Sequence, residues 1–471
     1  MSSFPLLRSA SRLLLLGLAL TRSVTLPVTL PADDGGGAEK TVEAQRLETI
    51  RYGTESEIAA LIQTIKTEKA LYLDDELITL VQNTRNRNIL TGVFSFFADR
   101  ERGGLEERAL RAIEERDDET NETVLAAIDY LGKVRSEKVT RDSIGQVLHQ
   151  LEDILDSEEQ RFMNTAFRAL GRVGGAAGGA VADEVTDYVI DYYTNRMPGS
   201  ETQREMIVAL GETGSKQGVS FLGELVDNND ERATLRMAAI ESLAKIGDSD
   251  GLDPILRAVS SQDPNIRSTA VGALGPFSGP QVDDAILEAF RDSYYRTRIS
   301  AATAARERKL ESAVPYLVYR AERDDTPAVK DEAIRALGAI GNGEATATLE
   351  SLLLNRKNAD RVRILAAETL IQNNADVYTP KLIIELDEAN SKKLTALYNG
   401  FLRVLGSAKT GELEPLISRF YASGGVIEKS YALDMTANNN FRNFREQVEI
   451  LTDEKNGSLS RKALAIIANW E

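Results

Sequence analysis

The sequence predicts an all-α protein built as an α-solenoid, which is a superhelix of antiparallel helix pairs. Apolar residues recur at helical spacing through most of the chain, and Gly-Asp and Asp-Pro turns separate the helical stretches. The same pattern returns every 31 to 40 residues. Each helix pair leaves one apolar face uncovered, so it is stable only against neighbouring pairs, as in a solenoid.

The repeating unit is clearest between residues 236 and 275. The first helix is expected to end at Gly247, because glycine tolerates the positive φ of a tight turn. A second helix is expected over residues 252–259. Asp263 can cap the next helix, and Pro264 fits its first position because no N–H is needed there.

The units align on a leucine near the end of one helix of each pair, with alanine standing in once. The spacing of these positions fits two short helices joined by two turns. The aligned residues are Leu131, Leu170, Leu210, Leu243, Leu274, Ala305, Leu337, Leu370 and Leu405.

Related phrases recur around these leucines: AFRALGRVG at 166–174, IVALGETG at 207–214, AIESLAKIG at 239–247 and AIRALGAIG at 333–341. With the Asp-x-x-x-Arg turn of residues 263–267, they resemble HEAT repeats of the short, bilin-lyase type. The resemblance covers about residues 40 to 471 and implies an armadillo-like solenoid of an exported bacterial protein. It implies little about function, because HEAT arrays serve many unrelated roles. The pattern departs at 305–306, which lack Leu-Gly, and at 371–373, which lack the glycine turn.

Residues 1–32 are expected to be a signal peptide and leader. Arg8 and Arg12 precede an apolar run over residues 13–20, which is the order of a secretory signal. The run is too short for a membrane span, which needs about 20 residues. No cleavage site stands out, so an uncleaved anchor and a plain apolar tail are the alternatives. The expected location is the periplasm or cell envelope, with no membrane span after signal cleavage.

The rest of the chain divides into three stretches. Residues 33–40 are expected to be a flexible acidic linker. Residues 41–120 hold amphipathic segments at irregular spacing and are expected to be degenerate N-terminal helical repeats, since solenoids need atypical end units. Residues 121–471 form the expected HEAT-like array, with a loop or hinge at the Gly-rich residues 174–182.

Composition excludes several classes of function. The net charge is −17 at pH 7, and no basic stripe is present to neutralise phosphates, so no nucleic-acid partner is expected. The acidity favours solubility or, alternatively, steering toward a basic partner. The chain has no cysteine, which excludes disulfides, thiol catalysis and thiolate zinc sites.

The sequence predicts no catalytic residue, no metal site and no cofactor. His149 is the sole histidine, and it lacks the partners that a zinc site or a Ser-His relay requires. Phosphate-loop, nucleophile-elbow and zinc-protease motifs are missing from the sequence. HEAT-like DNA glycosylases need a basic, Trp-lined groove, whereas this acidic chain has one tryptophan, Trp470, at its end.

The favoured function is a non-enzymatic scaffold that binds a protein partner on its concave face. In HEAT-type arrays one helix of each pair lines that face, and its exposed position lies two residues before the aligned leucine. Charges of both signs there could bind a charged partner surface, although they could also be merely solvated. The expected partner-binding row is Asp129, Arg168, Glu241, Arg335, Glu368 and Arg403, with Val208, Gly272 and Thr303 at its uncharged positions.

The alternative function is a structural or assembly role through self-association. Tyr188, Tyr192 and Tyr193 lie on one expected helix, and tyrosine is favoured at interfaces. Packing inside the array is the other interpretation of these rings. A lyase-type enzyme comes third, because its chemistry has no residues here to carry it.

Overall fold

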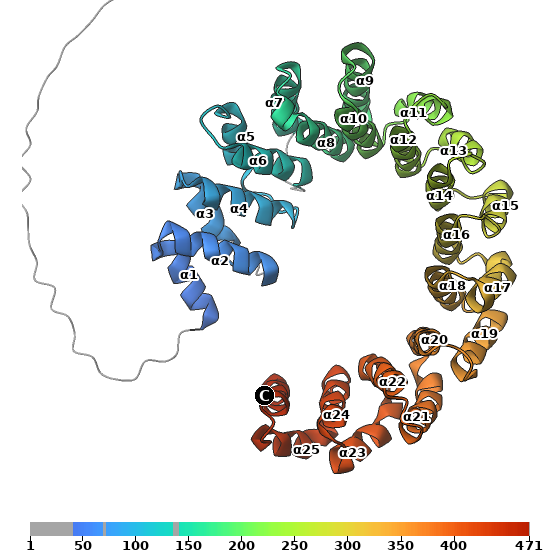
Figure 1. The fold of residues 1–471 in the computed structure, drawn as a ribbon. Coiled ribbons are helices and arrows are strands. Elements are labelled where there is room, and N and C mark those ends of the chain that lie inside the picture. Colours follow the sequence, from blue (N-terminus) through green and yellow to red (C-terminus); the bar gives the residue numbers. More distant parts are fainter. Residues whose placement is uncertain (1–40, 69–71, 135–140, 471) are drawn as a thin grey trace, which may run out of the picture.

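Helices follow one another along an open arc and alternate between an inner and an outer layer (Figure 1). The computed structural model describes residues 41–68, 72–134 and 141–470. These residues contain no β-strand, and the predicted all-α solenoid is confirmed. The signal peptide and leader expected at 1–32 and the linker expected at 33–40 lie outside the described residues.

The inner helices line the concave side of the arc, and each packs on the next inner helix (Figure 1). The inner layer comprises α2 (Glu55–Glu68), α4 (Arg87–Ala98), α6 (Asn121–Lys133), α8 (Gln160–Ala177), α10 (Ser200–Thr213), α12 (Ala233–Ile246), α14 (Pro264–Gly272), α16 (Tyr295–Arg308), α18 (Pro327–Ile340), α20 (Asp360–Asn373), α22 (Thr395–Ser407), α24 (Val426–Asn438) and α26 (Gly457–Trp470).

The outer helices cover the inner layer from the convex side, and they touch one another less than the inner helices do. The outer layer comprises α1 (Val42–Tyr52), α3 (Asp74–Asn83), α5 (Glu106–Glu114), α7 (Arg141–Asp156), α9 (Gly179–Arg196), α11 (Gly218–Asp227), α13 (Leu252–Ala258), α15 (Pro280–Ala289), α17 (Val314–Arg323), α19 (Gly343–Leu354), α21 (Ala375–Ser391), α23 (Glu414–Ser423) and α25 (Arg445–Ile450). Short 3₁₀ turns flank some of them: Ser249–Gly251, Glu311–Ala313, Gly411–Leu413, Arg442–Phe444 and Leu451–Asp453.

The turns of the repeating unit form as the sequence predicts. Gly247 ends α12 in the left-handed region, with φ of 68°. Asp263 caps α14 by accepting a hydrogen bond from the Asn265 N–H at 2.8 Å, and Pro264 is the first residue of that helix. Each turn therefore has a local cause in a residue that permits or satisfies its backbone.

The aligned leucines hold the core together. Every aligned position lies on an inner helix except Leu274, which lies two residues after the end of α14. Their side chains are at most 3% exposed, and Ala305, which replaces leucine on α16, is fully buried. The repeat register thus places one apolar residue of each unit between the two layers, where burial stabilises both.

The glycine that follows the leucine lets consecutive inner helices approach closely. A Cβ on Gly171 of α8 would lie 2.7 Å from the Cα of Ala209 on α10. A Cβ on Gly211 of α10 would lie 2.8 Å from the Cβ of Ser242 on α12. Because real Cβ atoms do not approach other atoms so closely, the spacing of the inner helices requires glycine at both positions.

The aligned leucine is not followed by glycine in every unit, and one of the exceptions holds its neighbour by an ion pair. On α16 the glycine position is taken by Arg306, whose Nε donates to Glu332 of α18 at 2.8 Å. The same helix ends at Lys309, which takes the left-handed φ of 49° that glycine adopts in other units. An ion pair therefore replaces a backbone contact in the middle of the array.

The Gly-rich stretch at 174–182 is not the loop that its composition predicts. Helix α8 continues to Ala177 and α9 begins at Gly179, so only Gly178 separates two helices of 18 residues each. A Cβ on Gly174 would lie 3.1 Å from Val185, and Gly175 lies against the backbone oxygen of Glu212. Gly174 and Gly175 thus permit close packing, while Gly178 lies where the chain passes from α8 to α9. The length of these two helices accounts for the long repeat spacing in this part of the chain.

The C-terminal end closes with a separate small core. Trp470 is only 7% exposed and packs in a cluster with Leu433, Val448 and Leu459. The cluster joins α24, α25 and α26 in one apolar contact.

Replacing Gly171 by alanine is expected to destabilise the array. Overpacking against Ala209 costs roughly 1–3 kcal/mol, which outweighs the helix propensity of about 1 kcal/mol that alanine gains over glycine. The measurement is the midpoint of urea unfolding, followed by circular dichroism. Gly145→Ala on α7 is the matched control, because no atom lies within 4 Å of the added Cβ, and it should stabilise the protein. An equal gain from both substitutions would contradict the close-contact argument.

Candidate functional site: the concave surface

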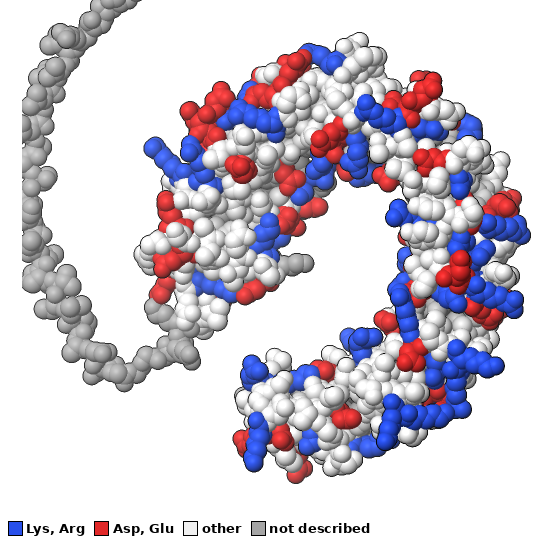
Figure 2. Space-filling view, viewed as in Figure 1, with Lys and Arg blue, Asp and Glu red and all other residues white. Residues whose placement is uncertain are grey.

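The concave surface is lined by the inner helices, and every charged residue of the predicted row lies on one of these helices. The charged members lie on α6, α8, α12, α18, α20 and α22, one to each helix. Glu241, Arg335, Glu368 and Arg403 are exposed, whereas Asp129 and Arg168 are half-buried. Figure 2 shows residues of both charges spaced along the inner rim of the arc.

Two members of the row are engaged in bridges between units. Arg168 of α8 donates to Glu205 of α10 at 2.7 Å. Asp129 of α6 accepts from Lys133 at 2.7 Å and contacts Arg172 of α8 at 3.5 Å. These side chains fasten neighbouring inner helices to each other, and a partner could reach them only in competition with those ion pairs.

Arg335 belongs to a small network on the inner face of α16 and α18. Its guanidinium lies 3.3 Å from Glu332, one turn earlier on the same helix. Glu332 also accepts from Arg306 and, at 3.2 Å, from the hydroxyl of Thr303. Arg335 is half exposed and shares its carboxylate with Arg306, so it keeps hydrogen-bonding capacity toward solvent.

Glu241, Glu368 and Arg403 are the members of the row that remain available. Each is exposed, and none makes an ion pair or side-chain hydrogen bond within the described part of the chain. The six charged residues also do not pair with one another. The structure therefore brings the row together as a line of separate charges rather than as one cluster.

The tyrosines of α9 pack inside the array. Tyr192 is 4% exposed and donates to the backbone oxygen of Leu155 at 3.1 Å. Tyr193 packs edge-on against Phe221 of α11, with ring centroids 5.2 Å apart, and burial raises its pKa to about 12. Tyr188 is half-buried and donates to Asp156 at 3.3 Å. These contacts favour a packing role for the rings over a self-association interface.

A ladder of basic side chains, which we call the arginine ladder, was missed by the sequence reasoning except at Arg267. It consists of the fourth residue of five consecutive inner helices. Each member donates to one or two backbone oxygens, either in the last turn of the preceding outer helix, as Arg236 does to Val226 at 2.9 Å, or in the turn that follows that helix, as Arg267 does to Ser261 at 2.9 Å. The members are Arg236, Arg267, Arg298, Lys330 and Arg363.

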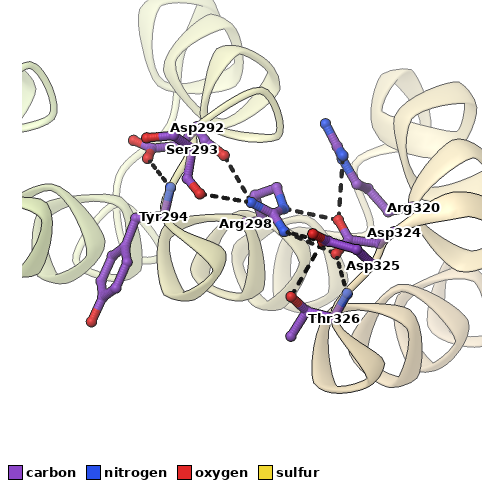
Figure 3. Close-up of polar contacts among 8 residues, drawn as sticks. All are labelled: Asp292, Ser293, Tyr294, Arg298, Arg320, Asp324, Asp325 and Thr326. Atoms are coloured by element: carbon purple, nitrogen blue, oxygen red, sulfur yellow. Dashed lines mark hydrogen bonds and ion pairs between the residues drawn. The ribbon is translucent and has the colours of Figure 1, made fainter.

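Arg298 shows how the ladder links successive units (Figure 3). It donates to the backbone oxygens of Asp292 and Ser293 in the turn before its own helix. It also makes two hydrogen bonds, at 2.8 and 2.9 Å, to Asp324 in the turn before α18. The recurrence of Arg at Arg236, Arg267, Arg298 and Arg363 was the sequence signal that could have revealed it.

Asp324 is held ionised by this geometry. Burial by itself would raise the pKa of this carboxyl group, but the hydrogen bonds from Arg298 and from the Thr326 N–H outweigh it, and the pKa lies below its ordinary value. Asp292, which pairs with Arg267 at 2.7 Å, has its pKa lowered for the same combination of reasons. Three members of the ladder, Arg267, Arg298 and Arg363, thus combine their backbone hydrogen bonds with a buried or half-buried ion pair.

The described residues contain no group of three or more His, Asp or Glu side chains that could hold a metal ion. His149 is exposed on α7. None of the described helices combines the length and apolarity that crossing a membrane requires.

Repeated helix pairs, an inner layer closed by leucine and glycine, and a basic residue in the first turn define an α-solenoid of the HEAT type. The family model described as Spirochaete HEAT repeat protein matches residues 50–466, and the chain belongs to this family. The match includes most of residues 41–120, in which the amphipathic segments are irregularly spaced.

Solved structures of other helical solenoids resemble the chain only distantly. Kap121p is 11% identical, with a TM-score of 0.43 over 89% of this chain and 52% of its own. Kap95p, from a study of RanGDP, is 13% identical, with a TM-score of 0.46 over 91% of this chain and 66% of its own. Human deoxyhypusine hydroxylase is 16% identical, with a TM-score of 0.25 over 58% of this chain and 98% of its own.

The chain spans about half the length of Kap121p. No curated protein matches the sequence. These resemblances identify neither a ligand nor an activity for this chain.

Replacing Asp324 by asparagine is expected to destabilise the array by roughly 3–5 kcal/mol near neutral pH, because Arg298 stays buried without its main counterion. The folded-state pKa of Asp324 is lowered, so its contribution is full above the unfolded pKa of about 3.9 and is lost as pH falls through the folded value. Urea unfolding should therefore show a difference between wild type and variant that shrinks at acid pH.

Asp284→Asn, at an exposed position of the outer helix α15, is the matched control and should change the unfolding midpoint little. A difference between wild type and Asp324→Asn that persists unchanged in acid would contradict the charge argument.

Proposed function

We propose that this protein is a non-enzymatic scaffold of the bacterial cell envelope that binds a protein partner on its concave face. The observation that carries the proposal is the set of exposed, unpaired charges Glu241, Glu368 and Arg403 on the inner helices α12, α20 and α22. Fixed helices hold these side chains in place, so a partner with matching charges meets an ordered surface.

The arrangement suits an extended partner. Packed helices lie roughly 8–10 Å apart, so the exposed positions of successive inner helices repeat at about that interval along the arc. Glu368 and Arg403 stand on adjacent inner helices and carry opposite charges. A partner segment with a basic group followed by an acidic group at similar spacing would satisfy both, and the opposite order would be repelled.

Export to the envelope is part of the proposal, and residues 1–32 support it by their sequence pattern. Fractionation of native cells, with determination of the mature N-terminus, tests it. Recovery from the envelope fraction with the first residues removed is the expected result. Recovery from the cytosol with the N-terminus intact would overturn the export proposal while leaving the concave-face proposal standing.

Partner binding on the concave face is expected to depend on the unpaired charges. Crosslinking of native cells, followed by mass spectrometry, should recover one recurrent partner joined to inner helices. Combined Glu368→Arg and Arg403→Glu substitutions should then weaken binding of the purified partner at least about tenfold, because two favourable charge contacts become repulsive. Circular dichroism should show unchanged helicity, since neither side chain packs in the core.

Asp284→Arg on the outer helix α15 is the matched control, because it reverses an exposed charge on the convex side. It should leave partner binding unchanged. Crosslinks confined to outer helices, or an equal effect of the inner and outer substitutions, would remove the concave row from consideration.

A further inference from the structure

A second surface with the composition of a binding site lies on the outer edge of the array, away from the concave row. It is formed by the N-cap and first turn of α16 together with the C-terminal half of α17. Most of its residues line an open cavity of about 510 Å³. We call it the Tyr–Arg patch and define it as Tyr294, Tyr295, Arg296, Tyr319, Arg320 and Arg323.

Exposed aromatic rings are concentrated there. Only four tyrosines are exposed in the described part of the chain, and two of them, Tyr295 and Tyr319, belong to the patch. Tyr319 is 52% exposed, and Tyr295 packs edge-on against Tyr294 with ring centroids 5.4 Å apart. Large aromatic rings expose apolar surface to water, and binding of a partner that buries this surface is therefore favourable.

The arginines of the patch lie against these rings. The guanidinium of Arg296 is 6.0 and 5.9 Å from the ring centroids of Tyr294 and Tyr295. Those of Arg320 and Arg323 lie 5.2 and 5.8 Å from the ring of Tyr319. The Nε–H of Arg296 also donates to the hydroxyl of Tyr295 at 3.2 Å. Contact with a ring restricts the orientation of a guanidinium, while its terminal N–H groups can still bind a carboxylate.

The acidic groups nearby do not neutralise the patch. Asp324 and Asp325 also line the cavity, and both contact Arg298 of the arginine ladder, at 2.8 and 3.2 Å. Arg320 has one longer contact to Asp324, at 3.3 Å. Arg296 and Arg323 make no ion pair with any described residue. Two exposed arginines therefore carry positive charge without a counterion.

This local charge matters more than the net charge of −17. At physiological ionic strength, exposed charges are screened beyond about 8 Å, so a ligand on the patch experiences mainly the arginines beside it. Figure 2 shows Lys and Arg gathered over the outer surface between α17 and α21 as well. Most of those other cations are paired, as Arg356 is with Glu388 and Lys381 with Glu350, so the positive charge without a counterion belongs to the patch itself.

We propose that the Tyr–Arg patch is a docking site for an acidic peptide segment of a partner protein. Carboxylates of the segment would accept hydrogen bonds from Arg296 and Arg323, while its apolar side chains would pack on the rings of Tyr295 and Tyr319. Tyrosine and arginine are the residues most enriched among those that dominate binding energy at protein interfaces. The proposal stands independently of the concave-face function.

The test measures the affinity of the purified protein for a labelled probe peptide of alternating Glu and Phe residues, by fluorescence anisotropy. The wild type should bind this probe, and should bind a probe with Lys in place of Glu at least about tenfold more weakly. Combined Tyr319→Ala and Arg323→Glu substitutions should lower the affinity for the acidic probe at least about tenfold. Asp325→Asn, which removes the exposed acid at the rim, should strengthen binding.

Arg85→Glu is the matched control, since Arg85 is an exposed arginine far along the chain, in the turn before α4, with no ion pair to the described residues. It should leave the affinity unchanged, as should the concave-face variant Glu368→Arg with Arg403→Glu. Circular dichroism confirms that each variant is folded.

Equal affinity for the acidic and basic probes, or no loss in the Tyr319→Ala and Arg323→Glu variant, would overturn the proposal. Full competition by inorganic phosphate at the probe concentration would also overturn it, because it would identify a site for small anions. Loss of probe binding in the concave-face variant would place the acidic segment on the other surface.

Discussion

The backbone contact between consecutive inner helices, made possible by the glycine after the repeated leucine, governs the shape of this protein. At Gly171 and Gly211 the next helix approaches so closely that a methyl group would not fit. The inner helices pack on one another along the whole arc, whereas the outer helices touch one another less. A layer that is tighter on one side bends toward that side, so the same contact that stabilises the stack also forms the concave surface (Figure 1).

The arginine ladder complements this contact at the N-terminal end of five consecutive inner helices, α12 to α20. Its side chains bind backbone oxygens in the last turn of the preceding outer helix or in the turn after it, where the helix itself supplies no partner. Arg267 and Arg298 also bind the aspartate of the next turn, so each unit is fixed to two neighbours. A solenoid has few contacts distant in sequence, and its rigidity therefore depends on such links between adjacent units.

Charge is distributed so that the two surfaces would select different partners. On the concave face, some charges bridge neighbouring helices, and Glu241, Glu368 and Arg403 are left available. On the outer edge, Arg296 and Arg323 have no counterion among the described residues and lie against tyrosine rings. A single scaffold could thus hold two ligands of different charge at once, which is what a rigid array of repeats is suited to do.

The sequence by itself determined the helix pairs, their repeat, the turns at Gly247 and Asp263, and the helix that carries each charged residue of the row. These features depend on local backbone preferences and on helical periodicity, which a single chain displays. Tertiary structure alone decided which charges are available: Arg168 is paired because Glu205 lies on the next helix, 37 residues away. It also converted the glycines at 174–182 from an expected loop into helix contacts, and it brought Tyr295 beside Arg320 and Arg323. Those outcomes depend on how neighbouring units pack, and the pattern within one unit does not contain that information.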